Sequence, residues 1–236
     1  PRLVVEDREA ALAAVKKNGF ALQFLSPKLQ ADREVVMAAV AQNGAVLQHA
    51  SGAFRADCQV VLAAVTSKEG SMRHATESFR AEYDSVLIIV MKDPVSLEFA
   101  SEELRGNPKI VKAAVKKKGW VAKFADPELL GSIEFMKDAA RKNGQILRYG
   151  TPEVRADKET VLAAVRSYGF ALECASEDLR DDIDVVLAAV TTSGWSLQFA
   201  SMALRNNQKV VLEAILDAPL AFRYASKELH EDPEAM

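Results

Sequence analysis

Residues 182–206 have the sequence DIDVVLAAVTTSGWSLQFASMALRN, and this 25-residue pattern recurs along the chain with no insertion or deletion. Its approximate form is D-x-x-V-V-L-A-A-V-x-x-N-G-x-A-L-x-F-A-S-x-x-L-R-A. Nine consecutive units match this form, and they begin at residues 7, 32, 57, 82, 107, 132, 157, 182 and 207. A fixed period of this length is typical of proteins that stack one small structural unit on the next. We therefore expect residues 1–236 to form a single repeat solenoid with partial units at both ends.

The first half of each unit has the features of a helix. It begins with Asp, Asn, Ser or Glu, and the first three are side chains that cap helix N-termini. The residues that follow are apolar at nearly every site, as in residues 35–40, which indicates a helix covered on several sides. Alanine occupies the eighth position in eight of the nine units and lets neighbouring helices approach closely: Ala14, Ala39, Ala64, Ala114, Ala139, Ala164, Ala189 and Ala214. A glycine near the middle of the unit is predicted to end the helix in a left-handed conformation, at Gly19, Gly44, Gly119, Gly144, Gly169 and Gly194.

The second half of each unit is compatible with two structures. Large apolar residues at alternating positions, as in residues 20–24, suit a short strand in a leucine-rich-repeat-like horseshoe. Small and apolar residues four positions apart and a scarcity of β-branched residues suit a short helix, which we favour. A serine near the end of the unit is expected to cap a final turn. The predicted fold class is thus all-α, an elongated α-solenoid of nine repeats, each with a longer helix, a short helix and a capped turn.

The overall composition argues against several classes of protein. The net charge of −3 and the isoelectric point near 5.8 are not those of a strongly basic nucleic-acid-binding domain. No apolar run approaches the about 20 residues of a membrane span. Cys58 and Cys174 have neither disulfide-framework nor zinc-ligand spacing, so we expect an intracellular, reducing compartment. Because the chain begins with Pro1 and not with methionine, we expect it to be a piece of a longer protein, and the organelle stays open.

Several short motifs recur with the period of the repeat. They are Val-Val-Leu-Ala-Ala-Val at 60–65 and 185–190, Asn-Gly at 18–19 and 43–44, Leu-Gln-Phe-Ala-Ser at 197–201 and Ser-Glu-Glu-Leu-Arg at 101–105. With these motifs, residues 7–231 resemble the repeat family catalogued as domain of unknown function 4116. The resemblance implies a helical repeat and brings no catalytic residue with it. The fifth and sixth units depart most from the pattern, at Lys112, Ala122, Leu130, Lys137, Asp138 and Gly150.

The sequence contains no converging group of residues that indicates catalysis. His49 and His74 occupy the same position of consecutive units, where they suit either a metal pair or pH-sensitive contact or two fillers of aromatic size, which we favour. Cys58 lies at a helix start and is open to mild reactivity, although a neutral surface thiol is the simpler interpretation. The repeat period explains every glycine, so the Asn-Gly pairs do not indicate a phosphate-binding loop. We predict no catalytic residue, no metal, no cofactor and no small-molecule substrate.

An arginine stands at the twenty-fourth position of six units: Arg55, Arg80, Arg105, Arg155, Arg180 and Arg205. A column of guanidinium groups is suited to bind carboxylates or phosphates along the repeats. Each of these arginines also precedes an acid or amide by two residues, as Arg55 precedes Asp57. We therefore favour a structural ladder with these capping residues over an anion-binding role.

Basic residues are concentrated in the fifth and sixth units: Lys109, Lys112, Lys116, Lys117, Lys118, Lys123, Lys137, Arg141, Lys142 and Arg148. Basic residues are normal near helix C-termini, but because the apolar pattern lapses in the same units, we hypothesise that this cluster binds an acidic partner. Trp120 lies among these residues and is a candidate anchor of the kind that dominates protein interfaces, although core filling is the simpler interpretation.

The repeat architecture and the basic cluster together favour a non-enzymatic scaffold for protein–protein interaction, because stacked repeats present an extended surface. The expected partner is a protein of unknown identity, which the basic cluster suggests is acidic. The alternative is a nucleic-acid-binding solenoid that uses the basic residues of the fifth and sixth units. A steep salt dependence of binding would favour that alternative, because phosphate contacts release counterions.

Overall fold

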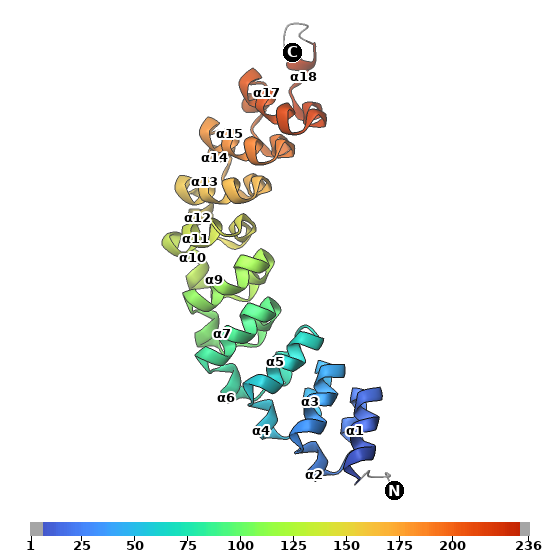
Figure 1. Ribbon diagram of the computed structural model, residues 1–236. Coiled ribbons are helices and arrows are strands. Elements are labelled where there is room, and N and C mark those ends of the chain that lie inside the picture. Colours follow the sequence, from blue (N-terminus) through green and yellow to red (C-terminus); the bar gives the residue numbers. More distant parts are fainter. Residues whose placement is uncertain (1–6, 232–236) are drawn as a thin grey trace. The chain divides into compact units, whose positions relative to one another are not determined.

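The computed structural model describes residues 7–231, and this part of the chain is helical and contains no strand (Figure 1). Each repeat consists of a long α-helix, a short 3-10 helix (η) and a single turn of α-helix. The all-α repeat fold predicted from the sequence is confirmed. The alternative of a short strand is wrong, because the segment in question forms a 3-10 helix, for example η2 (Gly44–His49).

The helices of the described part have the following bounds. The long helices are α1 (Arg8–Lys17), α3 (Arg33–Gln42), α5 (Cys58–Ser67), α7 (Tyr83–Lys92), α9 (Pro108–Lys117), α11 (Ile133–Ala140), α13 (Lys158–Ser167), α15 (Ile183–Thr192) and α17 (Gln208–Asp217). The 3-10 helices are η1 (Gly19–Phe24), η2 (Gly44–His49), η3 (Ser71–His74), η4 (Pro94–Phe99), η5 (Gly119–Phe124), η6 (Gly144–Tyr149), η7 (Gly169–Cys174), η8 (Gly194–Phe199) and η9 (Pro219–Tyr224). The single-turn helices are α2 (Pro27–Gln30), α4 (Gly52–Arg55), α6 (Glu77–Arg80), α8 (Glu102–Arg105), α10 (Pro127–Gly131), α12 (Pro152–Ala156), α14 (Glu177–Arg180), α16 (Met202–Arg205) and α18 (Lys227–Glu231).

Capping side chains set both ends of the long helix. In the third repeat, Asp57 Oδ1 accepts hydrogen bonds from the backbone N–H of Gln59 (2.9 Å) and of Val60 (3.0 Å), which satisfies two donors at the helix start. In the second repeat the long helix ends before Asn43, whose backbone is extended with a φ of −155°. Asn43 Oδ1 then accepts from the N–H of Ala45 at 3.0 Å. One asparagine therefore follows the long helix and caps the 3-10 helix.

The glycine after this asparagine has a different role from the predicted one. Within residues 7–231 the only positive φ is that of Gly70, at 78°. The prediction of a left-handed helix end is therefore wrong at Gly19, Gly44, Gly119, Gly144, Gly169 and Gly194. A Cβ atom added to Gly44 would lie 2.0 Å from the carbonyl oxygen of Ala64 in the next repeat. Glycine is required there because the 3-10 helix begins directly against the neighbouring long helix.

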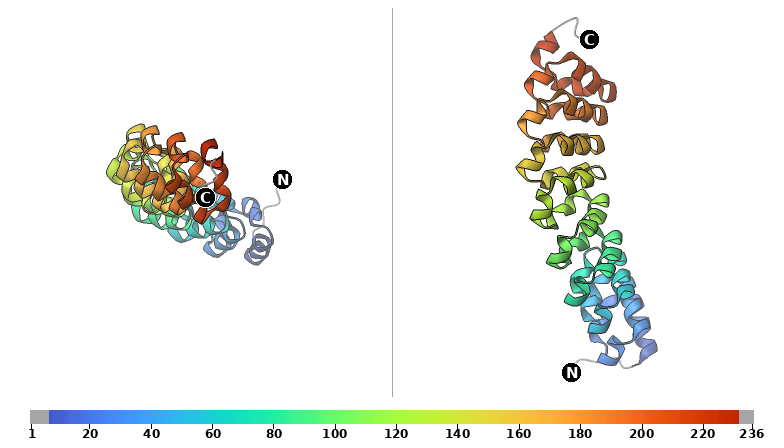
Figure 2. Two further views of the ribbon diagram at one scale, coloured as in Figure 1. Left: turned by 90° about the horizontal axis from the view of Figure 1, so that it is seen from above. Right: turned by 90° about the vertical axis from the view of Figure 1, so that its left-hand side faces the viewer.

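The chain packs as two compact units, residues 1–114 and 115–236. In the first unit α1, α3, α5 and α7 lie side by side, and in the second unit α11, α13, α15 and α17 do the same (Figures 1 and 2). Several 3-10 helices contact both their own long helix and the next one, as η7 contacts α13 and α15. Each unit thus has a layer of long helices and a layer of 3-10 helices. That residues 1–236 form a single solenoid stays a prediction.

The apolar core lies between these two layers. In α5, Val60, Val61, Ala64 and Val65 are buried, and these are the fourth, fifth, eighth and ninth positions of the repeat. Burial of each valine is worth about 1.5–3 kcal/mol. The third, sixth, seventh and tenth positions of the repeat are exposed or half-buried in α5. We call these four positions the outer face of the long helix, and they are the ones free to vary without loss of the core.

A backbone hydrogen bond joins the ends of consecutive repeats. The N–H of Ser201 donates to Arg180 O at 2.9 Å, and the N–H of Ser226 donates to Arg205 O at 2.9 Å. Ser201 Oγ also accepts from the N–H of Leu204 at 3.1 Å, so the predicted serine cap is confirmed here, whereas Ser51 makes no such bond. The serine therefore both starts the last helical turn and ties it to the previous repeat.

Candidate functional site

The basic residues predicted as a partner-binding cluster lie on several elements of both units. Lys109 and Lys112 belong to the first unit, and the remaining ones belong to the second. In the second unit, Lys116 and Lys117 end α9, Lys118 follows it, Lys123 lies in η5, Lys137 lies in α11, Arg141 and Lys142 follow α11, and Arg148 lies in η6. Arg141 and Arg148 line two different cavities. The single cluster expected from the sequence therefore contributes to at least two separate surfaces.

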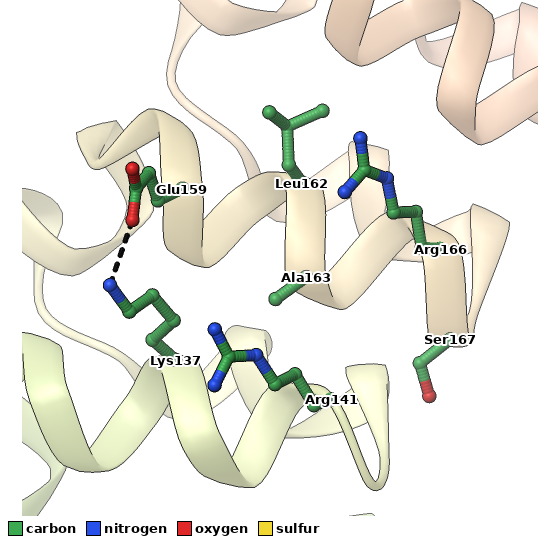
Figure 3. Close-up of a pocket in the computed structure, with 7 residues that line it drawn as sticks. All are labelled: Lys137, Arg141, Glu159, Leu162, Ala163, Arg166 and Ser167. Carbon is green, nitrogen blue, oxygen red and sulfur yellow. Dashed lines mark hydrogen bonds and ion pairs between the residues drawn. The ribbon is translucent and has the colours of Figure 1, made fainter.

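The first cavity is a surface cleft of about 340 Å³ on the outer face of α11 and α13 (Figure 3). It is lined by Lys137, Arg141, Glu159, Leu162, Ala163, Arg166 and Ser167. We call it the α11–α13 cleft. Leu162 and Ala163 are half-buried and form its apolar part, whereas the charged side chains come from both helices.

The charges of the α11–α13 cleft are unevenly paired. Lys137 Nζ lies 2.8 Å from Glu159 Oε2, and the hydrogen bond from Lys137 lowers the pKa of the Glu159 carboxyl below its usual value. Within residues 7–231, the guanidinium groups of Arg141 and Arg166 form no hydrogen bond or ion pair, although the charge of Arg141 also lowers the pKa of the Glu159 carboxyl. The cleft therefore has a net positive charge that comes from two guanidinium groups.

The second cavity, of about 260 Å³, lies among η5, η6 and η7. Its rings are those of Trp120, Tyr149, Tyr168 and Phe170, and we call it the aromatic pocket. Trp120 and Tyr168 are each 39% exposed, so the interpretation of Trp120 as a core filler is wrong. The Tyr168 ring stacks on Phe170 with the centroids 5.7 Å apart, and Lys123 Nζ lies 4.9 Å from the centroid of the Trp120 ring.

A charged pair lies at the same pocket. Arg148 Nη2 is 3.4 Å from Glu173 Oε2, and both residues line the cavity. Cys174 is half-buried in the lining, and burial raises the pKa of its thiol. The pocket therefore combines exposed ring faces with one cation and one anion, a combination suited to hold an amphipathic side chain.

The arginine column has partners other than the expected ones. Asp57 Oδ2 lies 2.6 Å from Arg33 Nη1, and Asp57 Oδ1 accepts from the helix N-terminus. Likewise, Asp182 Oδ2 lies 2.7 Å from Lys158 Nζ. The structural ladder expected between Arg55 and Asp57 is thus replaced by one that joins the first helical residue of one repeat to the capping aspartate of the next.

The column arginines themselves are half-buried beside the 3-10 helices. Arg80 Nη1 donates to the carbonyl of Phe99 at 3.5 Å, and Gln30, at the same position in the first repeat, donates from Nε2 to Leu22 O (3.1 Å) and Leu25 O (3.3 Å). Buried Nε atoms with no hydrogen-bond partner in the described part belong to Arg55, Arg80, Arg155, Arg180 and Arg205. These buried atoms are closed to a ligand, and an anion-binding role for the column stays a prediction.

The two histidines end consecutive 3-10 helices, η2 and η3. His49 and His74 are half-buried, and partial burial lowers the pKa of both imidazoles below 6.5, with Arg73 and His49 lowering that of His74 further. Within residues 7–231, no three His, Cys, Asp or Glu side chains gather in a way that could hold a metal ion. Partial burial therefore favours the neutral form of both histidines, which occupy the position that aromatic rings occupy in other repeats.

The sequence prediction missed three residues that shape the two cavities. Glu159 and Arg166 lie after Arg148, the last residue of the predicted basic cluster. Tyr168 stands at the twelfth position of its repeat, where asparagine is usual. A signal for Arg166 was present, because Arg166 lies one repeat after Arg141 at the tenth position. Pairs of residues separated by one repeat lie on neighbouring helices, so this comparison predicts proximity better than closeness in the sequence does.

A family model described as domain of unknown function (DUF4116) matches residues 7–55, 57–105, 107–155, 157–205 and 182–230. Each match spans two repeats and begins at the first position of a repeat, in agreement with the 25-residue register. Neither a curated protein nor a solved structure matches the chain. Among the helices of residues 7–231, none has the length and apolar character needed to cross a bilayer.

Proposed function

This chain belongs to the family described as domain of unknown function DUF4116, and from that premise we propose that it is a non-enzymatic scaffold that binds a partner protein. The observation on which the proposal rests is the aromatic pocket. Large exposed rings are costly to leave in water and are enriched at the centres of protein interfaces. Trp120 and Tyr168 provide such rings around one cavity in the second unit.

The chemistry of the pocket supports a protein ligand. Ring faces bind apolar and cationic side chains, and Glu173 adds a carboxylate beside them. Arg148 gives the opposite charge at the same rim. A side chain with an apolar body and a polar end satisfies both parts of the pocket, and peptide segments supply such side chains.

The test is affinity capture from an extract of cells that express the protein, followed by titration of the purified partner. We expect a protein that binds the wild-type chain and binds a Trp120→Ala/Tyr168→Ala variant at least tenfold more weakly. A Met202→Ala/Leu220→Ala variant is the matched control, because these side chains are 67% and 72% exposed and lie outside the pocket. Equal binding by both variants would place the interface elsewhere and remove the observation on which the proposal rests.

The second candidate function is nucleic-acid binding through the basic residues of the fifth and sixth repeats. It is favoured by the number of cations in residues 109–148 and disfavoured by an isoelectric point near 5.8. A variant with Lys116, Lys117, Lys118, Arg141 and Lys142 changed to Glu separates the two. Loss of bound nucleic acid, together with an affinity that falls steeply between 50 and 200 mM salt, would support nucleic-acid binding and contradict the scaffold.

A further inference from the structure

The α11–α13 cleft has a pair of arginines at one repeat position, which the other pairs of neighbouring repeats lack. Arg141 directly follows α11 and Arg166 lies in α13, and both occupy the tenth position of their repeats. The preceding repeat has Lys116 at this position, and the next two have Thr191 and Leu216. Thr191 Oγ1 is already bound to a side chain, Glu213 Oε1, at 2.9 Å. Two adjacent, unpaired guanidinium groups are therefore a property of this pair of helices and not of the repeat in general.

The ion pair inside the cleft does not involve the guanidinium groups of Arg141 and Arg166, which are therefore available to a ligand. Lys137 is held by Glu159 at 2.8 Å, and Figure 3 shows this pair at one end of the cleft, with Arg141 reaching from α11 toward Ala163 on α13. Because Lys137 and Glu159 offset each other, the net charge of the lining comes from Arg141 and Arg166. An anionic group that enters the cleft meets both without displacing an existing ion pair.

The part of the lining between the charges is apolar. Leu162 and Ala163 stand at the sixth and seventh positions of α13 and are half-buried. A bare phosphate gains nothing from such a surface, whereas a peptide places an apolar side chain between two acidic ones with ease. Guanidinium groups suit this task, because their planar donors bind carboxylates in a bidentate manner.

From these observations we infer that the α11–α13 cleft binds an acidic segment of a partner protein. Two carboxylates of the segment pair with Arg141 and Arg166, and an apolar side chain between them rests on Leu162 and Ala163. This inference rests on the proposed scaffold function and adds to it the chemistry of the partner. It concerns a surface different from the aromatic pocket, since the cleft is lined by long helices and the pocket by 3-10 helices and adjoining residues.

The test is a titration of the purified chain with a fluorescein-labelled peptide of alternating glutamate and leucine. The same titration is followed by NMR, through the backbone amides of α11 and α13 and the Nε–H signals of the arginines. We expect saturable binding, shifts confined to these amides and to Arg141 and Arg166, and an affinity that falls as salt is raised. An Arg141→Ala/Arg166→Ala variant should bind at least about tenfold more weakly.

Two controls test the role of charge, one by changing the protein outside the cleft and the other by changing the peptide. A Lys209→Ala/Lys227→Ala variant loses two exposed cations of the same unit outside the cleft and should bind like the wild type. A peptide with glutamine in place of glutamate keeps the length and the leucines and should not bind. If the two double variants lose affinity equally, binding follows net charge alone, and the inference is overturned.

Two further outcomes would also overturn it. The first is absence of peptide binding to the wild-type chain, and the second is binding of oligouridine RNA, but not of the peptide, with shifts at Arg141 and Arg166. These titrations use purified components, so they do not depend on capture of a partner. A protein that needs Trp120 and Tyr168 but not the two arginines would leave the scaffold standing and remove only the assignment of the cleft.

Discussion

Replacement of Gly44 by alanine tests why the repeat needs glycine between its two main helices. An added Cβ would lie 2.0 Å from Ala64 O, 2.5 Å from Ser71 Oγ and 2.7 Å from Ala64 C. Two of these atoms belong to the backbone at the end of α5, so rotation of a side chain cannot relieve the overlap. To restore a normal contact of about 3.5 Å, η2 and α5 would have to separate by about 1.5 Å.

The expected destabilisation follows from that displacement. Overpacking of a well-filled interior costs about 1–3 kcal/mol, and more where the obstacle is rigid. Alanine recovers about 0.4–1 kcal/mol, because it restricts the unfolded chain more than glycine does. We therefore expect Gly44→Ala to lower the free energy of unfolding by about 2 kcal/mol or more. Gly52→Ala is the matched control, since an added Cβ there meets nothing within 4 Å, and it should stabilise by about 0.4–1 kcal/mol.

The measurement is urea denaturation followed by circular dichroism, with amide hydrogen exchange to locate the effect. Exchange is needed because arrays of repeats can unfold in parts. Protection should fall in α3, η2 and α5 of the Gly44→Ala variant and should be unchanged in α15 and α17. Equal stability of the Gly44→Ala and Gly52→Ala variants would refute the close-contact explanation and return the glycine to a conformational role.

Three more predictions concern side chains at the ends of the repeats. Burial lowers the pKa of His49 and His74 below 6.5. The contribution of the neutral histidines to the free energy of unfolding should therefore be complete above pH 6.5 and should be lost as the pH falls toward their lowered pKa values. In urea melts at pH 7.5 and 5.5, a His49→Phe/His74→Phe variant should lose less stability between the two pH values than the wild type does. Arg180→Gln should keep wild-type stability in thermal melts, because Gln30 bonds the carbonyls of its own repeat at the same position, whereas Arg180→Ala should lose about 1 kcal/mol. Lys158→Ala should lower the stability only slightly, because its ion pairs with Asp182 and Asp184 are exposed, and the loss should disappear in 1 M NaCl.

The period of the sequence was sufficient to predict the repeat, the long helix and its caps. Those features depend on neighbours in the chain, as the hydrogen bonds of Asp57 and Asn43 illustrate. The role of Gly44 could not be obtained in the same way. A left-handed turn and a close approach both require glycine, and only the position of the next repeat distinguishes them. The partner of Arg55 was misjudged for the same reason, because Arg33 approaches Asp57 from the previous long helix.

The candidate site was predictable only in part, since it is built from residues one repeat apart. Counting basic residues in a continuous segment found Arg141 but grouped it with Arg148, which lines another cavity. The predicted cluster ended at Arg148 and so did not include Glu159 and Arg166. Glu159 changes the electrostatics most, because it neutralises Lys137 and leaves two arginines as the source of net charge. Such pairing depends on side-chain geometry and not on composition.

The separation of core and outer-face positions explains how one repeat can present different chemistry along the chain. Buried positions must keep their valines and alanines, because these residues hold each helix between its neighbours. The tenth position is free of that demand, and it is arginine in α13, exposed Met91 in α7 and the 80% exposed Leu216 in α17. Arginine at this position in two consecutive repeats gives the α11–α13 cleft the two guanidinium groups on which the inferred binding of an acidic segment rests. If the inferred cleft binds its partner, specificity depends on pairs of adjacent repeats, because residues one period apart line the same cleft.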